Sequence, residues 1–335
     1  MSKPIPPTYS TTNWRACNTA VKQRGSLLIW FDPATQWLAT PTGKRGRQAV
    51  FSDAAIQTCL TLRALFGLPL RQVTGMVTSL LALAGLDWPV PDYSTLCHRQ
   101  KGLAVAIAHR PGTGALHLLI DIEPVSATGS SEPARGIKAE GCGEWCAKKH
   151  GPSKPRLWRK VHLGIDAETL EIRAIEVTGA GVGPSRGLKT NHCRAMDAPM
   201  LPELLEQIAS DQPIGKVSAD GAYVTRAWHE AIAGRGAIAV IPTRRNGRPW
   251  QKDTPGAQAR NDILRTTCRL GRTIWRRWSG YHQRSLVETK MHCFKLLGER
   301  VRPRDFDRQV AELQIRPVIL NRFTARGTPI PQRIG

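Results

Sequence analysis

Four side chains in the last fifth of the sequence have types and a spacing that could bind a phosphodiester. They follow the pattern Tyr281-x2-Arg284-x3-Glu288-x6-Lys295. On a helix that turns by about 100° per residue, all four fall within one arc of about 60°. A phenol, a guanidinium, a carboxylate and an ammonium do not form a core face. The stripe suits a phosphodiester backbone, with the cations holding phosphate and the carboxylate holding a metal ion.

Two other interpretations of this stripe stay open. A solvent-exposed helix face with pairing between residues four apart would also place Arg284 beside Glu288. Alternatively, Ser285-x-x-Glu288 could be a capping box, in which case the helix begins later and the stripe is weaker. Neither interpretation requires a ligand.

Two aspartates follow apolar segments that read as strands. Asp121 ends the segment 116–121, and Asp220 ends the segment 214–220 and precedes a tight turn. Side chains at the carboxyl edge of an open sheet reach the crevice there. A single aspartate in this position is more often a turn former or a helix cap. Two of them together with Glu288, in a chain of net charge +22, indicate a site built from three carboxylates.

Three carboxylates can hold two Mg²⁺ or Mn²⁺ ions about 3.5–4 Å apart. One ion would activate water or a 3′-hydroxyl, and the other would stabilise the leaving oxygen of an in-line displacement. Hard oxygen ligands favour these ions over zinc. The only zinc-like cluster, Cys142-x3-Cys146-x3-His150, has one ligand pair where structural zinc sites have two. We therefore expect the 8 cysteines to be reduced thiols.

The charge of the chain predicts a polyanionic partner. There are 48 Lys and Arg residues against 26 Asp and Glu in 335 residues, and the basic residues are spread over dense stretches at 148–160, 244–252 and 265–277. Nucleic acid is the expected partner, and a ribosome-associated or membrane-surface protein is the alternative. No apolar run reaches the roughly 18 residues that span a bilayer, and the first residues lack a signal-peptide pattern. We expect a cytoplasmic protein.

The elements that must position these residues fall into two regions. Residues 1–45, rich in Pro, Thr and Trp, resemble an arm anchored by Trp14, Trp30 and Trp37. Three helices are then predicted at about 53–66, 70–84 and 93–106, with N-cap signals at Ser52 and Asp92. They are similar to a helix-turn-helix unit, although any small helical bundle gives much the same pattern. The last helix carries Ser94, Thr95, His98, Arg99 and Lys101.

From about residue 115 the pattern alternates between strands and helices. Apart from segments 122–135 and 179–196, which resemble inserted loops, this order predicts an α/β domain with a mixed sheet. The expected strands are 116–121, 158–165, 171–177, 214–220 and 237–241, and the expected helices are 199–208, 225–233, 281–297 and one near 306–320 whose end at Pro317 is open.

The motif Tyr281-x2-Arg284-x3-Glu288-x6-Lys295 resembles the signature of a large group of DDE transposases from bacterial insertion sequences. Further stretches are similar to the branch known as the insertion-sequence-five type, and the likeness covers nearly the whole chain. These stretches are Trp30-Phe31-Asp32, the segment 41–47, Gly143-Glu144-Trp145, the segment 159–163, the segment 219–223 and the segment 305–309.

The resemblance implies a ribonuclease-H-like catalytic domain with a mixed sheet at 111–325. It implies a helical, helix-turn-helix-like DNA-binding region at 46–110, with the arm at 1–45 before it and a tail at 326–335 after the catalytic domain. It also implies that Asp121, Asp220 and Glu288 are the catalytic residues and bind the metal ions.

The function implied is cleavage of DNA at terminal inverted repeats and joining of the freed 3′-hydroxyls to target DNA. Arg284 and Lys295 would hold phosphate, and Tyr281 would orient or stack on the flanking nucleotide. Arg159 and Lys160, in the first basic stretch, are expected to contact the DNA backbone. Bringing two DNA ends together implies at least a homodimer, associated with the nucleoid.

The sequence departs from the family pattern around the first acid. The family usually continues its first Asp directly into Ser-Thr-Gly, whereas here the segment 122–135 separates Asp121 from Gly136-Ile137-Lys138. Glu123 therefore competes with Asp121 for the role of first acid. Such insertions could mark a decaying mobile element, so a DNA-binding remnant or repressor without catalysis is one alternative. A metal-dependent nuclease that never joins DNA ends is another.

Overall fold

The computed structural model describes residues 8–30, 35–122, 137–139, 158–179 and 200–334, except for single positions at 42, 44, 47, 111, 113, 252 and 299. The chain forms two compact units. One contains residues 1–108 and 318–335, and the other contains residues 109–317. The predicted cysteine and histidine cluster at 142–150 lies outside the described residues, as does Glu123.

The first unit is built mainly of helices, and its central helix is the one that the sequence predicts best. Helix α2 (Asp53–Phe66) begins after Ser52, whose side chain accepts a hydrogen bond from the backbone N–H of Ala55. It ends at Gly67, which has a left-handed conformation with φ of 63°. Glycine adopts this conformation without a steric penalty. Both predicted ends of this helix are confirmed.

Two further helices pack with α2. Helix α3 (Leu70–Leu83) confirms the predicted segment, whereas α4 (Tyr93–Arg99) is shorter than the predicted 93–106. Asp92 caps α4 as expected, by accepting from Thr95 N–H. The chain then tightens into a 3₁₀ turn, η2 (Gln100–Gly102), and continues in an extended conformation. The predicted end of this helix was wrong. Apolar residues recur at helical spacing beyond the turn, although the chain there is not helical.

The predicted anchors of the N-terminal arm divide into two kinds. Trp30, at the end of η1 (Leu27–Trp30), and Trp37 are buried, and Trp37 stacks on Trp88. Trp14, the first residue of α1 (Trp14–Arg24), is 67% exposed and therefore does not anchor the arm within the first unit. The two ends of the chain meet in this unit, because β1 (Thr8–Thr11) pairs with β9 (Pro331–Ile334) in an antiparallel ribbon.

Within the described residues, the second unit is built on a mixed sheet of 7 strands in the order β7-β6-β2-β4-β3-β8, with β5 paired to β4. Strand β2 is antiparallel to β4 on one side and parallel to β6 on the other. The predicted mixed sheet is therefore confirmed, and its core is consistent with a ribonuclease-H-like domain. The strands are β2 (Leu116–Ile122), β3 (Ile137–Ala139), β4 (Trp158–Asp166), β5 (Ile172–Gly179), β6 (Ile214–Ser218), β7 (Ile238–Val240) and β8 (Arg300–Val301).

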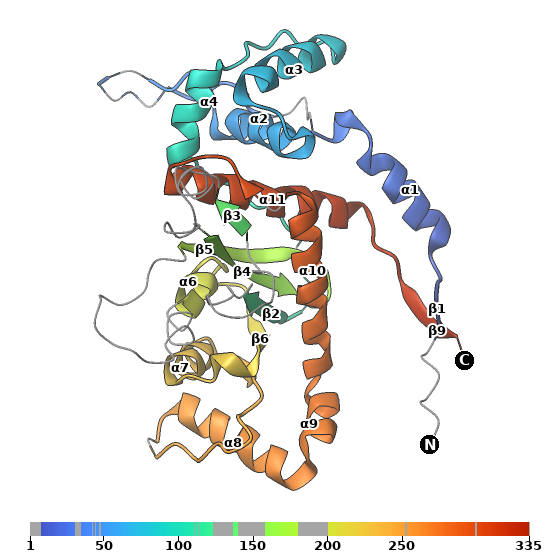
Figure 1. The fold of residues 1–335 in the computed structure, drawn as a ribbon, viewed down its shortest axis with the longest axis vertical. Helices are drawn as coiled ribbons and strands as arrows, with labels where there is room; N and C mark the ends of the chain where they lie inside the picture. The colour runs from blue at the N-terminus through green and yellow to red at the C-terminus, as the bar shows by residue number, and fades with distance from the viewer. Residues whose placement is uncertain are drawn as a thin grey trace, which may run out of the picture. The chain divides into compact units, whose positions relative to one another are not determined.

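Helices cover both faces of this sheet. Helices α6 (Met200–Glu206) and α7 (Arg226–Gly234) share a buried apolar cluster with β2 and β6, which includes Leu118, Ile120 and Trp228. Helix α10 (Ser285–Leu296) contacts β2 and β4, and Figure 1 shows it on the opposite side of the sheet from α6 and α7. Alternate residues of β2 thus face different helices, as the period of two in a strand requires.

The basic stretch between β7 and the signature motif contains two helices that the sequence analysis did not predict. Helix α8 (Pro255–Leu270) begins after Thr254, whose side chain caps it, with a proline in its first turn. Both features are ordinary helix-start signals. The sequence analysis missed the helix because arginines are interspersed among its apolar residues and make their helical spacing hard to recognise. Helix α9 (Arg272–Ser279) follows, with Trp275 buried. Helix α11 (Phe306–Arg326) continues through Pro317 and ends six residues beyond the predicted limit.

Two histidines of the second unit lie in its interior, and this predicts a loss of stability in mild acid. His162 and His229 are almost fully buried, and burial lowers the pKa of each to about 4. Nearby cations add to the effect, Lys160 for His162 and Arg260 for His229. Because the folded pKa lies below the unfolded value of about 6.5, the unfolded chain binds protons first as the pH falls.

We therefore expect full stability above about pH 6.5 and a progressive loss toward pH 4, of about 3 kcal/mol for each histidine. Urea unfolding midpoints measured at pH 7.5, 6 and 5 test this. In a variant with His162→Phe and His229→Phe, the midpoint should change less between pH 6.5 and 5 than in the unmodified protein. Parallel curves for the two proteins would contradict the prediction.

Candidate functional site

The sheet register brings the two predicted aspartates to the same edge. Strands β2 and β6 are parallel, with Leu118 opposite Val217 and Leu119 opposite Ser218. Continued by two positions, this register sets Asp121 opposite Asp220, where both strands reach their carboxyl ends. Asp220 caps the 3₁₀ turn η4 (Gly221–Tyr223) by accepting from Gly221 N–H at 2.6 Å. One of its oxygens is thus engaged in the turn.

The signature residues do not lie on one continuous α-helix, which corrects the sequence prediction. Tyr281 to Arg284 form a 3₁₀ turn, η5 (Tyr281–Arg284), and α10 begins only at Ser285. The predicted common arc assumed a uniform turn of 100° per residue, and η5 is wound more tightly. The alternative in which the helix begins later is confirmed, but its capping box is not formed, because Arg284 precedes the first helical residue and no side chain in the described ranges caps this end.

Arg284 joins two of the three predicted acids. Its Nη1 donates to Glu288 Oε1 at 2.8 Å, and its Nη2 donates to Asp121 Oδ1 at 3.2 Å. The first contact is the helix pair expected from the spacing, and the second reaches across to the sheet. Because one planar guanidinium contacts both, the two carboxylates lie within the span of a single arginine fork.

The charges of all three acids act on this arginine, and those of Asp220 and Asp121 also act on Tyr281. Burial alone would lower the pKa of Arg284, yet Asp121, Asp220 and Glu288, together with Tyr281, raise it. Burial raises the pKa of Tyr281, and Asp220 and Asp121 act in the same direction against the opposing effect of Arg284 and Arg276. All three carboxylates therefore lie near enough to Arg284 to act on its charge. Arg284 stays a cation there at any ordinary pH, and Tyr281 stays a neutral phenol at neutral pH.

The carboxylates match a divalent metal ion in donor chemistry, since all three offer hard oxygen ligands. Asp121 is 15% exposed and Glu288 is 53% exposed, so a ligand can reach both side chains. Within the described ranges, no three His, Cys, Asp or Glu side chains are close enough together to hold a metal ion. To coordinate one ion together, Asp121 and Glu288 would have to exchange contacts with Arg284 for contacts with the metal.

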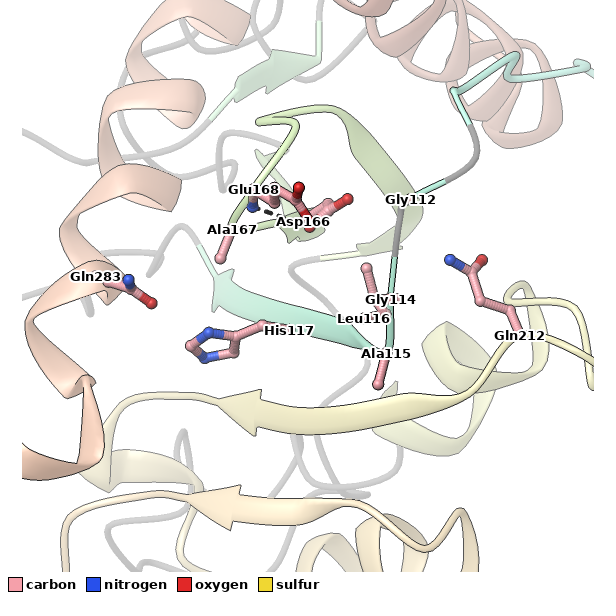
Figure 2. Close-up of a pocket in the computed structure, with 10 residues that line it drawn as sticks. All are labelled: Gly112, Gly114, Ala115, Leu116, His117, Asp166, Ala167, Glu168, Gln212 and Gln283. Carbon is pink, nitrogen blue, oxygen red and sulfur yellow. Dashed lines mark hydrogen bonds between the residues drawn. The ribbon is translucent and has the colours of Figure 1, made fainter. Parts of the chain in front are cut away.

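A second connection joins the elements that carry the three acids. His117 lies four residues before Asp121 on the same face of β2, and its Nε2 is 2.9 Å from Ser218 Oγ on β6. The side chain of Gln283, the residue before Arg284, also acts on this imidazole and raises its pKa against the larger effect of burial. Figure 2 shows the imidazole of His117 directed toward Gln283. The sequence analysis did not identify this histidine as a candidate. Its spacing from Asp121 could have indicated it, because residues four apart in a strand lie on the same face.

The remaining predicted residues lie in different surroundings. Lys295 is half-buried in the last turn of α10, and Lys160 is half-buried on β4. Arg159 is 8% exposed, its Nε donates to Gln309 Oε1 at 2.6 Å, and its guanidinium lies over the ring of Phe306. These contacts give Arg159 partners inside the protein, and a contact to DNA phosphate would have to replace them.

Comparison with known families agrees with this arrangement. Residues 112–322 match a family described as "Transposase DDE domain", and residues 22–130 match a second family of the same description. Domains of this kind carry out transposition, act on DNA and normally use divalent metal ions. None of the helices in the described ranges is long and apolar enough to cross a membrane. Because one match spans more than half of the chain and covers the sheet edge, η5 and α10, this protein belongs to the DDE transposase family.

Proposed function

We propose that this protein is a transposase of the insertion-sequence-five type, which cuts DNA at terminal inverted repeats and joins the freed 3′-ends to target DNA. The observation that carries the proposal is the contact of Arg284 with both Asp121 and Glu288, at the edge where Asp220 also lies. Residues from β2, the end of β6 and α10 converge there, although they are up to 167 positions apart in the sequence. If the contact of Arg284 with Asp121 and Glu288 served only to stabilise the fold, a third carboxylate, that of Asp220, would not be required at the same edge.

Each residue has a proposed role that follows from its position. Asp121, Asp220 and Glu288 hold two Mg²⁺ or Mn²⁺ ions, which when bound supply charge neutralisation and a deprotonated water or 3′-hydroxyl. Arg284 and Lys295 bind phosphate oxygens. Tyr281 keeps its phenol neutral and orients or stacks on the flanking nucleotide.

The other contacts with DNA are proposed to come from the basic surfaces and the N-terminal region. The arginines of 265–277 are mostly exposed, which suits sequence-independent contact with the backbone. Lys160 is proposed to contact phosphate, and Arg159 to do so only where DNA displaces Gln309. The three helices within 46–110 are proposed to recognise the inverted repeats, and two chains are proposed to hold the two ends.

A cleavage assay on the natural flanking DNA tests the proposal. The substrate is an end-labelled fragment that carries the coding sequence with its flanks, incubated with the full chain and Mg²⁺ or Mn²⁺. We expect nicks at defined positions on both sides of the gene and, with a target plasmid, joined products. Nicks without joining would favour a nuclease, and binding without nicks would favour a DNA-binding remnant.

The link through His117 gives a further prediction. Burial and the charge of Lys216 lower its pKa against the opposing effects of Asp166 and Gln283, and the imidazole lies within hydrogen-bond distance of Ser218 on β6. We expect His117→Ala to lower the cleavage rate by about 10–100-fold, the scale observed when a residue that orients a catalytic group is lost. DNA affinity should change less than twofold.

The matched control for this variant is His292→Ala, which removes an exposed imidazole from α10. It should cleave at the unmodified rate. In addition, His117→Gln keeps a hydrogen-bonding side chain and should recover part of the lost rate. Cleavage by His117→Ala at the unmodified rate would show that η5 is held in place without this histidine.

A further inference from the structure

A polar cavity of about 330 Å³ lies beside Asp220, and the three-carboxylate site does not account for most of its lining. The lining includes Asp220, Thr243, Arg244, Arg272, Arg276 and Tyr281. Thr243 and Arg244 follow β7, whereas Arg272 and Arg276 belong to α9. None of the three arginines is part of the signature motif. The cavity therefore joins the candidate catalytic edge to the two helices that the sequence analysis missed.

Two of the arginines are already held in place by the protein. Arg272 donates from Nη2 to the carbonyl oxygen of Thr243 at 2.9 Å. The guanidinium carbon of Arg276 lies 5.6 Å from the centroid of the Tyr281 ring. That ring packs in turn against the buried Trp275, with centroids 5.9 Å apart. These contacts orient exposed side chains before a ligand binds, which reduces the entropy cost of binding.

Thr243 provides a second and independent observation. It is only 4% exposed, and its Oγ1 has no hydrogen-bond partner in the described part of the chain. A buried hydroxyl without a partner costs about 1–3 kcal/mol. Because Thr243 is one of the residues that line the cavity, a rotation of its side chain toward a ligand with hydrogen-bonding oxygens would supply the missing partner.

The chemistry of the lining selects a phosphate. Guanidinium groups form bidentate, charge-assisted hydrogen bonds with phosphate oxygens, and three of them repel a metal ion. A nucleobase would leave the charges of the arginines uncompensated. We propose that this cavity binds one phosphate of the DNA strand within about two nucleotides of the bond that is cut. Arg244, Arg272 and Arg276 thereby set the position of the strand relative to Asp220.

This inference rests on the proposed function, and it differs from the general attraction of a basic surface. A sequence-independent basic surface contacts several phosphates weakly, so neutralising any one of them lowers its affinity for DNA by a similar, small amount. The cavity predicts that one phosphate position is coupled to these arginines and that its neighbours are not.

Methylphosphonate scanning tests this difference. Cleavage sites are first mapped with the unmodified protein, and duplexes are then made with one neutral methylphosphonate at each position near the cut. Affinities are measured in a Glu288→Gln background, because that residue lies outside the cavity lining and the DNA stays intact. We expect one position to weaken binding by about tenfold, the scale of a lost charge-assisted hydrogen bond.

The double variant Arg272→Gln and Arg276→Gln should bind unmodified DNA about tenfold more weakly and should lose no further affinity at that position. Thr243→Val, which keeps the shape but removes the hydroxyl, should show a smaller loss at the same position. The matched control is Arg277→Gln, which removes one charge from α9 outside the cavity lining. It should weaken binding to every duplex alike and keep the tenfold loss.

The outcomes separate this inference from the proposed function. If the unmodified protein does not cut DNA with either ion, the proposed function fails. If it cuts DNA but the double variant still shows the full tenfold loss at the sensitive position, or no position is sensitive, the cavity proposal alone is overturned. Circular dichroism spectra and melting temperatures of the variants exclude misfolding as the cause of a lost effect.

Discussion

Glu288→Gln is expected to abolish DNA cleavage while DNA binding persists. The substitution keeps the length of the side chain and removes the charge that a divalent ion requires of a carboxylate ligand. Because Glu288 is 53% exposed, the loss of its contact with Arg284 should hardly affect folding. We expect the cleavage rate to fall by at least about 10³-fold, the scale of losing a group that acts on the transition state. Rates are measured on end-labelled flanking DNA, and affinity by gel shift.

The matched control uses another exposed acid of the second unit. Asp262 pairs with Arg265 on the surface of α8, and Asp262→Asn removes one negative charge far from η5 in the sequence. It should cleave at nearly the unmodified rate. Substitution of Asp121 or Asp220 by Asn should reproduce the effect of Glu288→Gln. Residual cleavage above one tenth in any of the three would remove that residue from the catalytic set.

Arg284→Lys is expected to lower cleavage by about 10²–10³-fold although the positive charge is retained. A lysine presents a single ammonium and cannot contact Asp121 and Glu288 through two parallel N–H groups as the arginine does. The two acids would lose their common partner, and phosphate would lose a bidentate one. The effect should appear in the rate at saturating DNA more than in DNA affinity.

Arg265→Lys is the control for this substitution, because Arg265 is 66% exposed and pairs with Asp262 on its own helix. It keeps the positive charge that faces the DNA backbone and should change the cleavage rate at saturating DNA less than twofold. If Arg284→Lys cleaves as fast as the unmodified protein, a positive charge alone is sufficient at this position, and the bridging geometry has no catalytic role.

Much of the fold was predictable because local signals agreed with the tertiary structure. The capped start and the glycine end of α2 were present in the sequence, as were the hairpin of β4 and β5 and the apolar strand that carries Asp121. The same local features, strand ends and motif spacing, were sufficient to propose the three acids as candidates. The contact of Arg284 with Asp121 across 163 positions was not predictable, because it depends on the sheet register.

The features that the sequence did not reveal depend on packing or on backbone detail. The 3₁₀ turn at Tyr281–Arg284 changes the direction of Arg284, and no residue in it marks a departure from α-helix. Helix α8 was hidden because charged residues outnumber apolar ones on its exposed side. The partner of His117 on β6 and the cavity beside Asp220 arise from segments far apart in the chain.

The most direct measurement of the central claim is Mn²⁺ binding by electron paramagnetic resonance, with the full chain bound to its flanking DNA. Removal of divalent ions with a chelator should stop cleavage, and added Mn²⁺ should restore it. The account predicts up to two bound ions per chain, lost or weakened at least tenfold when Asp121, Asp220 or Glu288 is replaced by its amide. Equal Mn²⁺ binding by the unmodified protein and by all three variants would contradict the claim that these carboxylates form one metal site.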